Sequence, residues 1–217
     1  MISARSPIAA LTQQLESRWQ KLPLPDVSNW DLAIFVVLLA TWSVVAQVGG
    51  LIGLLPVLLM AGASVLLSLG AFRNWYSCPA LRALGWTVPE RRLFGIAVIA
   101  GVSAAFAVSL IVRAAGMRTV AEPAPLAVLV VTVGPLVEES FFRGFLQPCI
   151  ALVAGTVPAV TATALCFAAV HGPVTVLQFS CLTAMGVGYG LLRLRSGSIG
   201  GPVLMHATYN LVFLLFN

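Results

Sequence analysis

Two adjacent glutamates, Glu138 and Glu139, lie inside one of the most apolar stretches of the chain, with Arg143 shortly after them. A charge at the centre of a bilayer costs about 2.5–3.5 kcal/mol even on the most lenient scale, so such residues are functional candidates. Glu139 and Arg143 are four residues apart with the acid first, which is the favourable orientation for a helical ion pair. One arginine neutralises one carboxylate, and this leaves Glu138 as the acid without a partner.

The chain has only two histidines, and each belongs to a short pattern in an apolar segment. His171 ends the run FAAVH, so Phe167 and His171 share a helix face, and His206 begins HATYN, so His206 and Asn210 share another. A glutamate near a histidine is a suitable general base for activating water. A second imidazole and an amide can donate hydrogen bonds to a developing oxyanion. These residues predict hydrolysis, most simply of a peptide bond at membrane depth.

Other interpretations of the same residues stay open. One glutamate and two histidines could hold zinc with an open position for water, although the sequence has no HExxH pattern. Glu138 and His171 could form the proton relay of a transporter. The chain could also be an inactive scaffold, and Glu139 with Arg143 could be a purely structural ion pair.

The composition limits the class of protein that can carry these groups. Of 217 residues, 59% are hydrophobic and 9% are charged, whereas a soluble domain has about 25% charged residues. The sequence therefore predicts a polytopic membrane protein. The net charge of +5 does not indicate nucleic-acid binding, because the basic residues cluster between apolar segments, where they suit topology signals and anionic headgroups.

The apolar segments predict an all-α bundle of about seven transmembrane helices, since about 20 apolar residues make one span. The expected spans are 31–48, 51–72, 93–114, 125–152, 156–171, 173–194 and 199–216. Three parts are expected, namely an N-terminal segment with an interfacial amphipathic helix at 1–29, accessory spans at 30–122, and a four-helix catalytic core at 123–217. The arginine-rich connections and the positive-inside rule predict a cytoplasmic N-terminus.

Two glycine patterns concern the packing of these helices. Gly186 and Gly190 form a GxxxG pair in the sixth span, which permits close helix approach. Gly134 and Pro135 lie just before the glutamates, and the proline removes the hydrogen bond to the carbonyl of Val131, so we expect a kink there. The four cysteines are scattered without paired spacing and are expected to be packing residues: Cys78, Cys149, Cys166 and Cys181.

Taken together, the patterns resemble a known family. EESFFR, FAAVH and HATYN are similar to the EExxxR, FxxxH and HxxxN motifs of the CAAX protease and bacteriocin-processing (CPBP) family, in the same order and on separate segments. This family comprises glutamic intramembrane proteases related to Rce-type CAAX-prenyl endopeptidases, and the resemblance covers about 125–217. It implies that Glu138 and His171 activate the water and that His206 and Asn210 form the oxyanion site. Glu139, Arg143 and Phe167 would support them, and no metal cofactor is implied.

The resemblance also bears on partners and location. It implies a membrane-anchored protein or peptide substrate, and the compact chain favours a bacterial inner membrane over processing of prenylated CAAX proteins. The bilayer is the other expected partner, no nucleic acid is expected, and the oligomeric state is not predicted.

The depth of His171 is the point on which this site depends. At 1.5 Å per residue, Glu138 lies ~20 Å from the external start of its span and His206 ~10 Å from the internal start of its own, so these two match. His171 lies ~22 Å from an internal start, nearer the outside. The two groups meet only if the helices are staggered, or if the chain breaks after His171 inside the protein.

Overall fold

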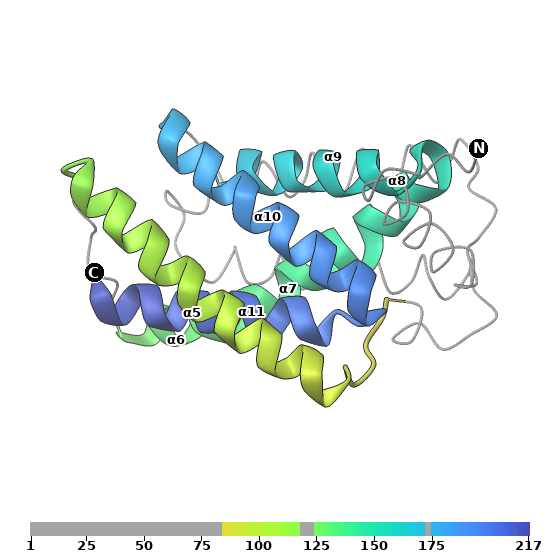
Figure 1. The fold of residues 1–217 in the computed structure, drawn as a ribbon, viewed down its shortest axis with the longest axis horizontal. Coiled ribbons are helices and arrows are strands. Elements are labelled where there is room, and N and C mark those ends of the chain that lie inside the picture. The colour runs from red at the N-terminus through yellow and green to blue at the C-terminus, as the bar shows by residue number, and fades with distance from the viewer. Residues whose placement is uncertain (1–83, 118–123, 172–174) are drawn as a thin grey trace, which may run out of the picture.

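The computed structural model describes residues 84–117, 124–171 and 175–217, and all regular structure in these ranges is helical (Figure 1). The elements are α5 (Arg91–Ala114), α6 (Ala124–Val131), α7 (Val133–Glu139), the π-helix η1 (Ser140–Leu146), α8 (Gln147–Ala154), α9 (Thr156–Ala169), α10 (Val176–Ser196) and α11 (Gly200–Phe216). The predicted all-α class is therefore confirmed for these ranges. The expected amphipathic helix and the spans at 31–48 and 51–72 lie outside the described residues.

Among the described helices, α5 is the one that is long and apolar enough to cross a membrane. Two shorter apolar helices, α9 and α11, accompany it. The last two expected spans correspond closely to α10 and α11, although α10 begins at Val176, three residues later than predicted. A capping box sets that start, because the Thr175 hydroxyl accepts from the Gln178 amide N–H and the Gln178 side chain accepts from the Thr175 N–H.

The segment predicted as one span at 125–152 is helical from 124 to 154 apart from Thr132, and it consists of four consecutive elements, one of them a π-helix. Helix α6 ends at Val131, and the chain turns at Thr132 before α7 begins. Pro135 has no N–H to continue the hydrogen-bond ladder of α6, which is the physical reason for an interruption here. The expected kink thus corresponds to a one-residue interruption at Thr132, and the π-helix that contains Arg143 begins about two turns later.

Helix α10 packs against α9 on one side and approaches α5 and α11 on the other (Figure 1). Small residues permit both approaches. A Cβ atom on Gly186 would lie 2.9 Å from the Ala164 Cα atom of α9, so the predicted close packing of the GxxxG pair is confirmed. Helices α5 and α11 cross at Gly101, where a Cβ atom would lie 2.5 Å from the Met205 carbonyl oxygen.

The crossing of α5 and α11 yields a matched pair of glycine substitutions. We expect Gly101→Ala to lower the free energy of unfolding by about 1–3 kcal/mol, because the added methyl group must push the α11 backbone away. Gly95→Ala in the same helix is the control, since a Cβ atom there meets nothing within 4 Å. Thermal unfolding of both variants in detergent measures the difference. Equal midpoints would contradict the tight crossing.

Candidate active site

A buried ion pair joins the end of α7 to the π-helix. Arg143 Nε lies 3.2 Å from Glu139 Oε2, and Arg143 Nη1 donates to Glu139 Oε1 at 3.3 Å. Both side chains are fully shielded from solvent. A buried pair is stable only when its geometry is good and its remaining polar atoms are also satisfied. Both terminal nitrogens of Arg143 have hydrogen-bond acceptors, whereas Nε and Glu139 Oε2 face each other as an ion pair without a hydrogen bond.

Three aromatic rings and a carbonyl group surround the Arg143 guanidinium. Its central carbon lies 4.7 Å from the ring centroid of Phe167, 5.1 Å from that of Tyr189 and 5.7 Å from that of Phe142. Ring faces carry negative potential, so each contact favours the cation. Arg143 Nη2 also donates to the Gly186 carbonyl oxygen at 2.9 Å.

The bond to Gly186 has a parallel one turn further along. Gln147 Nε2 donates to the Gly190 carbonyl oxygen at 3.2 Å, and Gln147 is fully buried. Arg143 and Gln147, four residues apart, thus donate to the carbonyl groups of Gly186 and Gly190, which are four residues apart on α10. The GxxxG pair serves two purposes here, because its Cα atoms face α9 while its carbonyl groups accept bonds from the segment that carries the ion pair.

Arg193 donates a hydrogen bond to a carbonyl group that the π-helix leaves without a backbone donor. The N–H of Gln147 bonds to the Phe142 carbonyl five residues back, as a π-helix requires. The next carbonyl group, that of Arg143, would need the N–H of residue 148, which is a proline and has none. Arg193 Nε supplies the missing donor at 3.2 Å, from a side chain that is almost fully buried. A buried carbonyl without a donor would be costly, so Arg193 stabilises the local backbone of the site.

His206 joins the ion pair from α11. Its Nδ1 lies 2.9 Å from Glu139 Oε1, so Glu139 contacts both Arg143 and His206. The imidazole stacks on the Tyr189 ring with centroids 4.8 Å apart and meets the Phe167 ring edge-on at 5.7 Å. The structure therefore holds His206 against the acid that the sequence paired with arginine, and not against Glu138.

His171 lies just beyond α9, in the turn that follows Ala169. Its Nδ1 is 2.7 Å from the Phe167 carbonyl oxygen. A carbonyl oxygen only accepts, so Nδ1 carries a proton, and in the neutral ring Nε2 is then the nitrogen with the lone pair. The residue is exposed, and this leaves a basic nitrogen that water or a substrate can reach.

Phe167 connects the two histidines. Its ring centroid lies 4.7 Å from that of His171 and 5.7 Å from that of His206, and Arg143 covers the same ring. One aromatic ring thus separates the exposed histidine from the buried ion pair. The depth mismatch that counting residues gave for His171 does not keep it away from this cluster.

Glu138 differs from its neighbour in burial and in the groups that contact it. Its side chain is half-buried, and its Oε2 atom is buried without a hydrogen-bond partner in the described part of the chain. Glu139 is fully buried and is held by two cationic or potentially cationic groups. Two adjacent residues of one type therefore occupy opposite environments.

Asn210 forms its hydrogen bond with a backbone group outside this cluster. Its Nδ2 donates to the Val130 carbonyl oxygen at 2.8 Å, next to the break between α6 and α7. The amide thereby satisfies a carbonyl group at the end of a short helix. The expected pairing of Asn210 with His206 at one oxyanion site is not formed by this contact, although the two residues lie one turn apart on α11.

Sequence reasoning missed three residues that build the site, namely Tyr189, Gln147 and Arg193. Tyr189 lies inside the GxxxG segment, whose small residues drew attention to packing alone. Gln147 is spaced four residues from Arg143, and Arg193 is a charged residue near the end of an apolar segment. The first spacing was a signal that could have been used, whereas Arg193 resembled an ordinary topology signal.

The three-ligand set of the zinc alternative does not come together in the described ranges. No group of three histidine, cysteine or acidic side chains there has the arrangement of a metal site. The cysteines in these ranges are free thiols, and Cys149 is buried as a packing residue. Cys78 lies outside the described residues.

One comparison with known proteins found a similarity that covers the residues of this site. Residues 120–212 match the family model described as type II CAAX prenyl endopeptidase Rce1-like. The match contains both glutamates, both histidines and the residues that surround them. Searches of the curated proteins and of the solved structures found no significant match.

The different environments of the two acids predict different effects on stability. Glu139→Gln leaves Arg143 buried without its counter-charge, so we expect a loss of about 3–5 kcal/mol. Glu138→Gln removes a carboxylate that makes no ion pair among the described residues, and we expect the thermal midpoint to stay close to that of the wild type. Thermal unfolding in detergent compares the two isosteric variants directly. Equal destabilisation would show that both acids are structural.

Proposed function

We propose that this protein is an intramembrane endopeptidase of the Rce1-like family, a proposal that the match of residues 120–212 to the model of that family supports. Its water would be activated by Glu138 and His171. The observation that carries this proposal is the asymmetry of the two glutamates. Glu139 is fully buried in an ion pair with Arg143 and contacts His206, whereas Glu138 is half-buried, makes no ion pair among the described residues and has an Oε2 atom without a hydrogen-bond partner there.

The proposed first step uses the free oxygen of Glu138 and the lone pair of His171 Nε2. A water molecule held between them loses a proton to one of these bases, and its oxygen attacks the carbon of the scissile carbonyl group. A tetrahedral intermediate with one negative oxygen forms. The same proton then passes to the leaving nitrogen as the C–N bond breaks, so no metal or external reductant is needed to balance the reaction. The hydrogen bond from His171 Nδ1 to the Phe167 carbonyl supports this role, because it fixes the tautomer.

The proposed stabiliser of the negative oxygen is His206. Its Nδ1 is occupied by Glu139, so a second N–H for the oxyanion is present only when the ring is an imidazolium. Two carboxylates, one guanidinium and one imidazolium carry no net charge together. Such a balanced group can stay in an apolar interior and still present a donor to the developing charge. Asn210 would join this role only by leaving the Val130 carbonyl, so we assign it the weaker part.

The substrate class follows from the setting of the site. The family and the apolar helices support a protein or peptide that is anchored in a membrane. We further propose a bacterial inner membrane with a cytoplasmic N-terminus, supported by the arginines that flank the start of α5 and the end of α10.

Cleavage assays with single-residue variants test the proposed mechanism. The full chain would be reconstituted in liposomes with a membrane-anchored reporter peptide, and product would be measured by mass spectrometry. We expect Glu138→Gln and His171→Ala each to reduce the rate at least about 100-fold, the lower range for a general base. Ser103→Ala serves as the control for reconstitution, since Ser103 is an exposed residue in the middle of α5.

Two outcomes would contradict this mechanism. Cleavage that persists in both Glu138→Gln and His171→Ala removes these residues from the chemistry. Loss of cleavage in a chelator, with recovery on addition of zinc, replaces the metal-independent route by the zinc alternative. By contrast, Glu139→Gln could lower the cleavage rate and the folded fraction by the same factor. That result would agree with a supporting role for Glu139.

A further inference from the structure

Tyr189 is a buried aromatic residue of α10 that contacts both the ion pair and the histidine of α11. Its side chain is almost fully shielded from solvent. Its ring is stacked on the His206 imidazole with 4.8 Å between the centroids and 19° between the planes. The central carbon of the Arg143 guanidinium lies 5.1 Å from the same ring centroid. Tyr189 belongs to none of the three motifs, so its contribution to the site has to be derived from these contacts.

The contact with Glu139 does not fix the orientation of His206 by itself. Nδ1 of His206 lies 2.9 Å from Glu139 Oε1, which sets the position of one edge of the ring. The imidazole could still turn about the line that joins these two atoms. Tyr189 lies against the face of the imidazole, and Phe167 meets the ring edge-on, with 77° between the planes. A ring that is held at its edge and at its face keeps one orientation.

The turn of α10 that carries Tyr189 is itself held in place. The Gly186 carbonyl accepts from Arg143 Nη2 at 2.9 Å, and the Gly190 carbonyl accepts from Gln147 Nε2 at 3.2 Å. Tyr189 lies between these two carbonyl groups in the chain. A shift of this turn would separate buried donors from their acceptors, which is costly. The tyrosine ring is therefore presented from a rigid segment.

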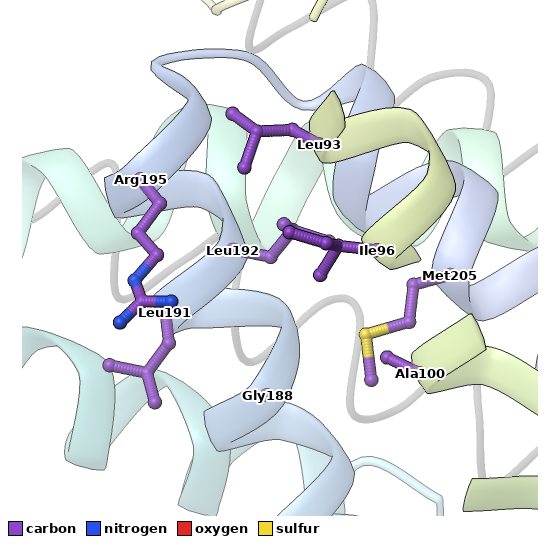
Figure 2. Close-up of a pocket in the computed structure, with 8 residues that line it drawn as sticks. All are labelled: Leu93, Ile96, Ala100, Gly188, Leu191, Leu192, Arg195 and Met205. Carbon is purple, nitrogen blue, oxygen red and sulfur yellow. The ribbon is translucent and has the colours of Figure 1, made fainter. Parts of the chain in front are cut away.

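The turns of α10 and α11 that carry the stacked pair face each other. Gly188 and Met205, which precede Tyr189 and His206 in the chain, line one apolar cavity of about 280 Å³ (Figure 2). A Cβ atom on Gly188 would lie 3.2 Å from Met205 Cε, so the glycine permits this close approach. The approach of the two helices here brings the two rings of the pair together.

We propose that Tyr189 is a positioning residue, whose ring holds the His206 imidazole so that Nε2 points to the oxygen of the scissile carbonyl group. Nε2 is the ring nitrogen that Glu139 leaves free. Its orientation matters because a hydrogen bond weakens steeply as it bends, and because donors to a developing negative oxygen act best when they are fixed before the reaction. Tyr189 acts through His206 and need not touch the substrate. This inference rests on the proposed function, in which His206 stabilises the negative oxygen.

Kinetics of ring variants in the liposome assay test this role. Tyr189→Leu removes the ring, and we expect kcat and kcat/KM to fall by the same factor, at least about tenfold, because His206 acts on the transition state. Tyr189→Phe keeps the ring and should retain the wild-type kcat. Tyr209→Leu is the matched control, since it removes a tyrosine ring of α11 that stacks on Phe213 at 5.7 Å. Its kcat should stay at the wild-type value.

NMR spectroscopy in detergent tests the contact without using activity. The chain has only two histidines, so selective labelling of histidine gives two sets of ring signals, and His171→Ala assigns them. An aromatic ring stacked on His206 shifts the signals of its carbon-bound protons to lower frequency. We expect Tyr189→Leu to move the His206 signals and Tyr189→Phe to leave them close to the wild-type position. The His171 signals, as the internal reference, should move much less.

Several results would overturn the positioning role. If the wild type cleaves and a folded Tyr189→Leu variant keeps the wild-type kcat, the role is wrong and the protease activity stands. A loss in Tyr189→Phe as large as in Tyr189→Leu would mean that the hydroxyl group is needed and the ring alone is not enough. The absence of a nuclear Overhauser effect between His206 and tyrosine ring protons in the wild type would show that the stack does not form, whether or not the variants fold. If the wild type does not cleave, the proposed function is wrong, and the NMR result still decides whether Tyr189 holds His206.

Discussion

The buried ion pair between Glu139 and Arg143 is the constraint on which the surrounding structure depends. Burying a guanidinium costs several kcal/mol unless each of its donors and faces has a partner. The chain meets this demand with a carboxylate on the preceding turn, a carbonyl group of Gly186 and three aromatic rings. Glycine at position 186 is then required for two reasons, because α9 and the arginine both approach the α10 backbone there.

The π-helix extends this constraint toward the end of α10. It places Glu139 and Arg143 on the same buried side, but together with Pro148 it deprives the Arg143 carbonyl of a backbone donor. Arg193 replaces that donor and also lies against Gly85, where a Cβ atom would meet its guanidinium at 2.6 Å. Glycine with a positive φ of 85° is therefore needed at the turn before α5. The missing backbone donor for the Arg143 carbonyl group thus constrains the residues in three segments: the π-helix, the end of α10 and the turn before α5.

The contacts that could be predicted from the sequence are those between residues one helical turn apart in the same segment. The ion pair of Glu139 with Arg143, the pairing of Phe167 with His171 and the glycines of α10 all follow from positions one turn apart on a chain. The contact of His206 with Glu139 could not be predicted, because helical spacing says which residues share a face but not which face of another helix they meet. Asn210 illustrates the same limit, since the break after Val131 exposes a carbonyl group that only the three-dimensional arrangement reveals.

The two adjacent glutamates can have different roles because the cations are distributed unequally between them. If Arg143 or His206 were shared, both carboxylates would be partly neutralised and neither would keep an oxygen for water. The backbone prevents sharing, because residues one position apart point about 100° from each other on a helix. Glu139 faces inward to Arg143 and His206, while Glu138 turns to a half-buried position and retains an oxygen atom without a partner in the described residues. A half-buried acid without an ion pair next to a fully buried, paired one is therefore a direct consequence of helical geometry once a single guanidinium has been buried.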